Sequence, residues 1–265
     1  MSVQAIPAEI FDLFVDQLGI EDDNPESRTA LLACTRVNTQ FYRRANSYIF
    51  SSLFISIIHS QKRLDDLRYI LNANPNIARC IRSITVEALS SHCDEIYCES
   101  LHLVLKQLSL LQKFGWISQL EHQTYCNKPD TAITQFSTMG YLFNLPSLTA
   151  SYFENVLYLP LSLFSGSGFC HLKSLSLVNV GFEEIGVDKL SGSLFSSLER
   201  LEITGALWTD EDLNAVKIIM TCAAPTLTTL ILFKTMFMYC EFPALSRFFY
   251  FLLLIFFILL KLDSF

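Results

Sequence analysis

The residues best suited to chemistry lie close together in the first half of the chain. They are His92, Cys93, Cys98 and His102, four zinc-type ligands within eleven residues. Cys98 and His102 would share a helix face, whereas the adjacent His92 and Cys93 are difficult to direct at one ion. This spacing matches no common zinc finger. We therefore predict ordinary loop and helix residues here, and no metal or other cofactor.

Motifs for nucleophilic or phosphoryl-transfer catalysis are also missing from the sequence. It contains no Gly-x-Ser-x-Gly, no glycine-rich phosphate loop and no His-Glu-x-x-His, and it has only nine glycines. The short stretch Gly166-Ser167-Gly168 lacks the context of a nucleophile elbow. The sequence therefore predicts a protein that is not an enzyme.

The composition favours a folded protein that does not bind nucleic acid. A hydrophobic content of 51% in 265 residues can fill a sizeable core. The net charge of −7 and the small basic clusters Arg43-Arg44 and Lys62-Arg63 argue against binding of nucleic acid. The eight cysteines show no paired spacing and the chain opens without a charged-then-apolar leader, so we expect a reducing compartment, cytoplasmic or nuclear.

Three short helices are predicted in the first fifty residues. Pro7 suits a first helical turn, and apolar residues follow at three- and four-residue spacing as far as Gly19. Residues 21–26 are polar and turn-prone, and Ser27 can cap a second helix that carries Leu31 and Leu32. Asn38 or Thr39 can start a third. Such a small unit has a marginal core, so some apolar side chains should face a partner or the next domain.

This segment resembles the F-box family, whose pattern opens with Leu-Pro-x-Glu-Ile/Leu and continues through Ala/Leu-x-x-Val-Cys-x-x-Trp. The matching positions are Ile6, Pro7, Glu9, Ile10, Phe14, Leu18, Leu31, Leu32, Cys34, Val37 and Phe41. Asn38 and Phe41 stand where the family often has cysteine and tryptophan, and the loop at 21–27 is longer than usual.

The resemblance implies a substrate-recognition subunit of an SCF-type (cullin-RING) ubiquitin ligase, an adaptor without catalysis of its own. The residues implied to bind the Skp-family adaptor, and through it cullin, are Ile6, Pro7, Glu9, Ile10, Phe14, Leu18, Leu32, Cys34, Val37 and Phe41. The alternative is that the same helices only cap the domain behind them, with Ile10 and Phe14 facing its core. The chain would then be a leucine-rich-repeat interaction scaffold with no ligase role.

Beyond residue 80 a pattern recurs with apolar residues at positions one, four and six. Clear copies begin at Ile81, Leu172, Leu198 and Leu227, and weaker ones at Ile117 and Leu145. Steps of 28, 27, 26 and 29 residues from Ile117 onward predict leucine-rich repeats. Together with the F-box-like start, this arrangement is similar to F-box proteins common in fungi.

In a repeat solenoid, positions four and six of each strand pack inward and the alternate positions line a concave surface. The candidate substrate-binding residues are therefore Ser174, Ser176, Arg200, Glu202 and Thr229. The alternative for each of them is a plain solubilising position. The sequence does not identify the protein substrate.

The predicted fold class is α+β or an α/β solenoid, with an N-terminal three-helix F-box-like module followed by a short irregular leucine-rich-repeat domain. We place the helical module at 1–55, the repeat-like domain at 56–240 and a hydrophobic tail at 241–265. The tail contains an uninterrupted apolar run at 248–260, shorter than the roughly 20 residues that span a bilayer. A tail anchor in a membrane, a piece of core and a gene-model artefact remain open for this run.

Overall fold

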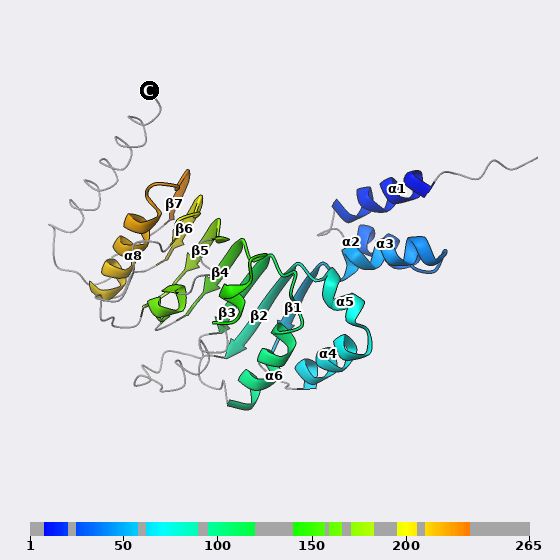
Figure 1. Ribbon diagram of the computed structural model, residues 1–265, viewed down its shortest axis with the longest axis horizontal. Coiled ribbons are helices and arrows are strands. Elements are labelled where there is room, and N and C mark those ends of the chain that lie inside the picture. Colours follow the sequence, from blue (N-terminus) through cyan, green and yellow to red (C-terminus); the bar gives the residue numbers. More distant parts are fainter. Residues whose placement is uncertain are drawn as a thin grey trace, which may run out of the picture.

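A computed structural model gives the structure of residues 8–20, 25–57, 62–89, 95–119, 140–156, 159–165, 171–182, 195–205 and 210–233. These ranges form an α/β fold in which all seven strands belong to one parallel sheet (Figure 1). The strands are β1 (Ser52–Ser56), β2 (Ser83–Leu89), β3 (Lys113–Gln119), β4 (Ala150–Glu154), β5 (Ser174–Val178), β6 (Arg200–Thr204) and β7 (Thr229–Phe233). Each strand pairs with the next one in the chain.

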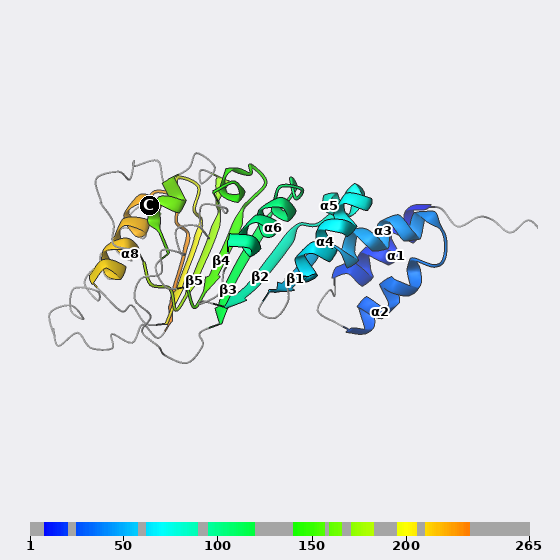
Figure 2. The ribbon, with the colours of Figure 1, turned by 90° about the horizontal axis from the view of Figure 1, so that it is seen from below.

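The connections between the strands differ from one another. The described helices that connect them are α4 (Lys62–Ala73), α5 (Pro75–Cys80), α6 (Glu95–Leu105), η1 (Leu142–Asn144), η2 (Leu161–Ser165) and α8 (Asp210–Ala223). Figures 1 and 2 show α4, α6 and α8 along one side of the sheet. Inward side chains of the strands, such as Ile84 and Leu201, join a single core with Val104 of α6 and Ile219 of α8.

The predicted fold class is wrong. The described chain is one α/β fold built on a seven-stranded all-parallel sheet, not an N-terminal three-helix module followed by a leucine-rich-repeat domain; only the α/β part of the prediction is compatible. The six-residue pattern does not extend to the rest of the leucine-rich-repeat template, which needs Asn or Cys at its ninth position. Val156 and Val180 stand at that position after β4 and β5, and both are buried.

The strands themselves follow the apolar pattern, with two corrections to its register. Position four of the clear copies, for example Leu175, Leu201 and Leu230, aligns across adjacent strands. The weaker copies were misplaced: Ile117 lies on the opposite face of β3, and Leu145 precedes the strand it was meant to start. The pairing puts Leu111 and Leu148 at the equivalent starting positions instead.

Five phenylalanines fill the middle of the core. Phe114 and Phe153 come from adjacent strands, and their ring centroids lie 6.4 Å apart. Phe143 contacts both rings from η1, and Phe164 joins Phe153 to Phe195. Aromatic burial of this size, with tilted and edge-to-face geometry, makes this cluster a main source of stability.

Three strands end in the same backbone conformation. Asn155, Asn179 and Gly205 follow β4, β5 and β6 at equivalent positions, and all three have positive φ. Asn179 donates through Nδ2 to Oδ1 of Asn155 at 3.0 Å. The third position requires glycine, because a Cβ on Gly205 would overlap the side chain of Asn179.

The first three helices lie beyond the β1 edge of the sheet in both views (Figures 1 and 2). They are α1 (Ala8–Ile20), α2 (Pro25–Cys34) and α3 (Thr39–Ile49). They have a small core of their own, made of Val15, Leu31, Cys34, Phe41 and Ala45. The side chain of Asn38 caps α3 by accepting from the amides of Gln40 and Phe41.

Candidate functional site

The outer face of α1 exposes large apolar side chains. Ile10, Leu13 and Phe14 are 53%, 64% and 56% exposed, although side chains of these types are usually buried in a core. Their spacing of three and four residues puts them on one side of the helix. Val15 and Phe11 lie on the other side and pack into the small core. Helix α1 therefore carries large apolar side chains on both of its faces, one in the small core and one exposed.

Two exposed residues come from α2 and the turn after it. Leu32 is 49% exposed and Val37 is 63% exposed. Neither belongs to the small core, whose residues from this stretch are Leu31 and Cys34. We refer to Ile10, Leu13, Phe14, Leu32 and Val37 as the outer apolar residues.

The structure divides the residues predicted to bind an adaptor into three groups. Ile10, Phe14, Leu32 and Val37 are exposed, and so is Glu9 in the first turn of α1. Cys34 and Phe41 are buried, and Leu18 is partly buried against them, so these three support the helices from within. Burial also raises the pKa of the Cys34 thiol. Ile6 and Pro7 lie outside the described residues.

An ionic contact fixes α1 against α3. The guanidinium of Arg44 donates to both carboxylate oxygens of Asp16, at 2.6 and 2.7 Å, and the Tyr48 hydroxyl donates to the same carboxylate at 3.0 Å. The hydrogen bond from Arg44 is the main reason why the pKa of Asp16 lies below its usual value. The same contact raises the pKa of Arg44, and burial followed by Asp16 raises that of Tyr48.

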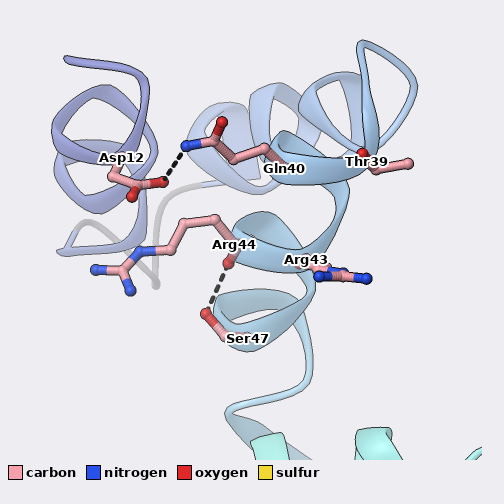
Figure 3. A pocket seen from close by; sticks show the side chains of 6 residues that line it. All are labelled: Asp12, Thr39, Gln40, Arg43, Arg44 and Ser47. Atoms are coloured by element: carbon pink, nitrogen blue, oxygen red, sulfur yellow. Dashed lines mark hydrogen bonds between the residues drawn. The ribbon is translucent and has the colours of Figure 1, made fainter. Parts of the chain in front are cut away.

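A shallow polar pocket of about 380 Å³ lies between the two helices (Figure 3). Figure 3 shows Gln40 of α3 reaching Asp12 of α1, with 3.4 Å between Nε2 and Oδ1, and Arg44 extending towards α1. Arg43 points away from α1 in this view. Within the pocket, Gln40 is bonded to Asp12, Arg44 to Asp16 and the Ser47 hydroxyl to the carbonyl of Arg44, so the first two of these contacts join α1 to α3.

The candidate substrate-binding residues meet on the face of the sheet opposite the helices. Ser174, Arg200 and Thr229 are neighbours at one register of β5, β6 and β7, and Ser176 lies beside Glu202 two residues further on. Arg200 and Glu202 form an ion pair at 3.3 Å. The structure thus brings all five predicted residues onto one surface, which we call the open face.

Sequence reasoning missed the part of the open face on β3 and β4. Tyr152 lies between Gly115 and Ser176 in register, and its hydroxyl donates to Glu154. Burial, followed by the hydrogen bond to Glu154, raises the pKa of Tyr152. The sequence feature that could have located β4 is Leu148-x-x-Ser151-x-Phe153. It was missed because a serine stands at position four, where the pattern expects an apolar residue.

The suspected zinc ligands are mostly beyond what the structure describes. His92 and Cys93 lie outside the described residues, as does the side chain of Cys98. His102 packs edge-on against Tyr141, with 6.4 Å between ring centroids. Among the side chains that are described, no three His, Cys, Asp or Glu residues come together as a metal site would require.

The apolar run at 248–260 also falls outside the described ranges. Within those ranges, every helix is too short or too polar to cross a bilayer. A scan against protein-family models and searches of curated proteins and of solved structures gave no match for this chain.

Proposed function

We propose that this chain is an F-box-type substrate-recognition subunit of an SCF ubiquitin ligase, and that it docks a Skp-family adaptor on the outer apolar residues of α1 and α2. The proposal rests on one observation above all. The helices that carry the F-box-like sequence leave Ile10, Phe14, Leu32 and Val37 exposed after their own core is complete. These are residues that the resemblance assigns to the adaptor.

The exposure of this surface has an energetic consequence. Burying a Leu, Ile or Phe side chain contributes about 1.5–3 kcal/mol, which α1 forgoes at Ile10, Leu13 and Phe14 in the free chain. A partner with a complementary apolar groove would recover this free energy and gain affinity from it. Glu9 would add a smaller favourable interaction with the N-terminal end of the α1 dipole.

The scaffold alternative requires Ile10 and Phe14 to face the core of the neighbouring domain. Both side chains are more than half exposed, and neither belongs to the large core of the sheet. This placement favours a surface for an external partner. In the proposal, the open face of the sheet then presents a bound protein substrate, with Arg200, Glu202 and Ser176 among its contacts.

The test is binding of the full chain to a purified Skp-family adaptor. Ile10→Asp and Phe14→Asp introduce a charge into the apolar surface without disturbing the small core, so each should weaken binding by at least about 30-fold, as expected for an interface hot spot. The matched control is Tyr69→Asp, at an exposed aromatic residue on α4 that lies outside the outer apolar residues. Its affinity should equal that of the wild type.

The alternatives give different results in the same assay. A folded chain that fails to bind the adaptor at micromolar concentrations would overturn the proposal and favour an interaction scaffold without a ligase role. Equal loss in Tyr69→Asp and Phe14→Asp would indicate association unrelated to α1. Circular dichroism of each variant establishes that the helices and the sheet are retained.

A further inference from the structure

A second concave surface lies on the helical side of the molecule, away from α1 and α2. It is a groove of about 500 Å³ between α4, α5 and the end of α6. Helix α4 lies beside both other helices in Figure 2. Arg68 and Asn72 line it from α4, one helical turn apart, and Arg79 lines it from α5. Gln107 and Ser109 contribute from the segment that follows α6.

The groove differs in charge from the pocket between α1 and α3. That pocket contains the acceptor Asp12, and its Arg44 is engaged by Asp16. The described lining of the α4–α6 groove contains two arginines and no carboxylate. The guanidinium groups of Arg68 and Arg79 form no hydrogen bond or ion pair with any other described residue. Two guanidinium groups without an acidic partner among the described residues therefore line one groove, although the chain as a whole carries a net charge of −7.

The polar groups of the groove are mainly hydrogen-bond donors. Each guanidinium presents several N–H groups in a planar fork that matches oxygen anions. Asn72 adds amide N–H donors and Ser109 a hydroxyl, while Leu71 and Ala78 form an apolar floor. The Nε2 of Gln107 already donates to the carbonyl of Leu103 at 3.4 Å, which leaves one of its two N–H groups for a ligand. The volume falls within the range of small-ligand sites and exceeds what a single water cluster needs.

We propose that the groove between α4, α5 and α6 binds the dianionic group of a phosphate monoester, held by Arg68 and Arg79. A phosphoryl dianion offers three acceptor oxygens and carries up to two negative charges, which two guanidinium groups neutralise. Such a group comes either on a phosphorylated side chain of a partner protein or on a small phosphorylated metabolite. None of the residues that line the groove belongs to α1, α2 or α3, so the groove and the outer apolar residues are separate surfaces.

Titration of the full chain with O-phosphoserine at constant ionic strength tests this proposal. We expect saturable binding to the wild type and no binding of unmodified serine. Arg68→Gln and Arg79→Gln should each weaken the affinity by about tenfold, and the lysine variants should lose less, because they keep the charge but not the fork. The matched control is Arg63→Gln, an exposed α4 arginine outside the groove, which should bind like the wild type.

Several outcomes would overturn the proposal. They are affinities of Arg68→Gln and Arg79→Gln equal to that of the wild type, binding of serine as strong as that of phosphoserine, and no saturation. A phosphoserine peptide that binds more tightly than glucose 6-phosphate assigns the group to a partner protein, and the reverse order assigns it to a metabolite. Thermal melting of each variant, and unchanged adaptor affinity measured in parallel, exclude loss of the fold as the cause.

Discussion

The apolar side chains of helices α1–α3 and those of the sheet differ in how far they are buried. In the sheet, inward residues such as Leu175, Leu201 and Phe153 are at most 1% exposed. In the helices, a core of only five residues is surrounded by large apolar side chains at about half exposure or more. The inward apolar side chains of the sheet are therefore buried within the chain itself, whereas many of those on the three helices are not.

The difference follows from geometry. A strand places alternate residues on opposite faces, so each added strand extends one continuous buried layer. Three helices of 13, 10 and 11 residues enclose little volume, and one stripe of each suffices to fill it. Any further apolar residue on such helices must face solvent or a partner. The exposed apolar surface of α1 and α2 is therefore the part of these helices that their small core does not cover.

The sharpest test of this comparison is to truncate one phenylalanine in each region. Phe153→Ala should cost about 3–5 kcal/mol of unfolding free energy, because it removes a fully buried ring that contacts three other phenylalanines. Phe14→Ala should change it by less than about 0.5 kcal/mol. Urea titration monitored by circular dichroism measures both. Similar losses in the two variants would mean that α1 packs its outer face within the free chain.

A smaller effect is expected at Ser151, the polar residue that interrupts the inward row of the sheet. Its hydroxyl oxygen is buried and has no hydrogen-bond partner among the described residues. Ser151→Ala should therefore stabilise the protein by about 1 kcal/mol, since it removes an unsatisfied buried group at almost constant volume. The control is Ser118→Ala on β3, where the hydroxyl accepts from Trp116 Nε1 at 3.1 Å. Ser118→Ala should destabilise the protein, and a Ser151→Ala variant that does the same would refute this account.

The sequence located most of the structure where apolar periodicity was strong. The clear copies of the pattern starting at Ile81, Leu172, Leu198 and Leu227 correspond to β2, β5, β6 and β7. Ser151 hid the register of β4, the aromatic residues Phe114 and Trp116 hid that of β3, and β1 had no predicted copy of the pattern. Apolar spacing did not locate helix ends: α6 ends at Leu105, although Leu108 and Leu111 continue its apolar spacing, because both are buried in the same core after the helix has ended. Apolar spacing indicates which residues are buried, and here buried residues continue beyond the end of the helix.

The candidate site shows a different limit of sequence reasoning. The helical stripe of α1 was visible, but spacing alone did not reveal that Phe11 and Val15 fill the small core while Ile10 and Phe14 stay outside it. A family motif likewise does not separate residues that touch a partner from those that hold the fold, such as Cys34 and Phe41. The arginine groove was also missed, since Arg68 and Arg79 come from different helices whose packing the sequence does not specify.

The smallest effect concerns how firmly α1 is held in position for a partner. Asp16 has a lowered pKa in the folded state, so its contact with Arg44 stabilises the fold fully above about pH 5. This contribution is lost as the pH falls below the ordinary value of 3.8, when Asp16 becomes protonated. Both side chains are partly exposed, so the contribution is at most about 1 kcal/mol.

Asp16→Asn tests this contribution, because it removes the charge and keeps the shape of the side chain. The stability difference between Asp16→Asn and the wild type should be largest at pH 7 and should shrink steadily as the pH falls below 3.8, as measured by urea titration. Asp66→Asn on α4 is the control, since Asp66 is exposed and forms none of the ion pairs between described residues. A difference independent of pH would mean that the Asp16 contact acts through packing rather than charge. In that case the affinity for the adaptor should not change with acid either. The position of α1 would then not depend on the charge of Asp16.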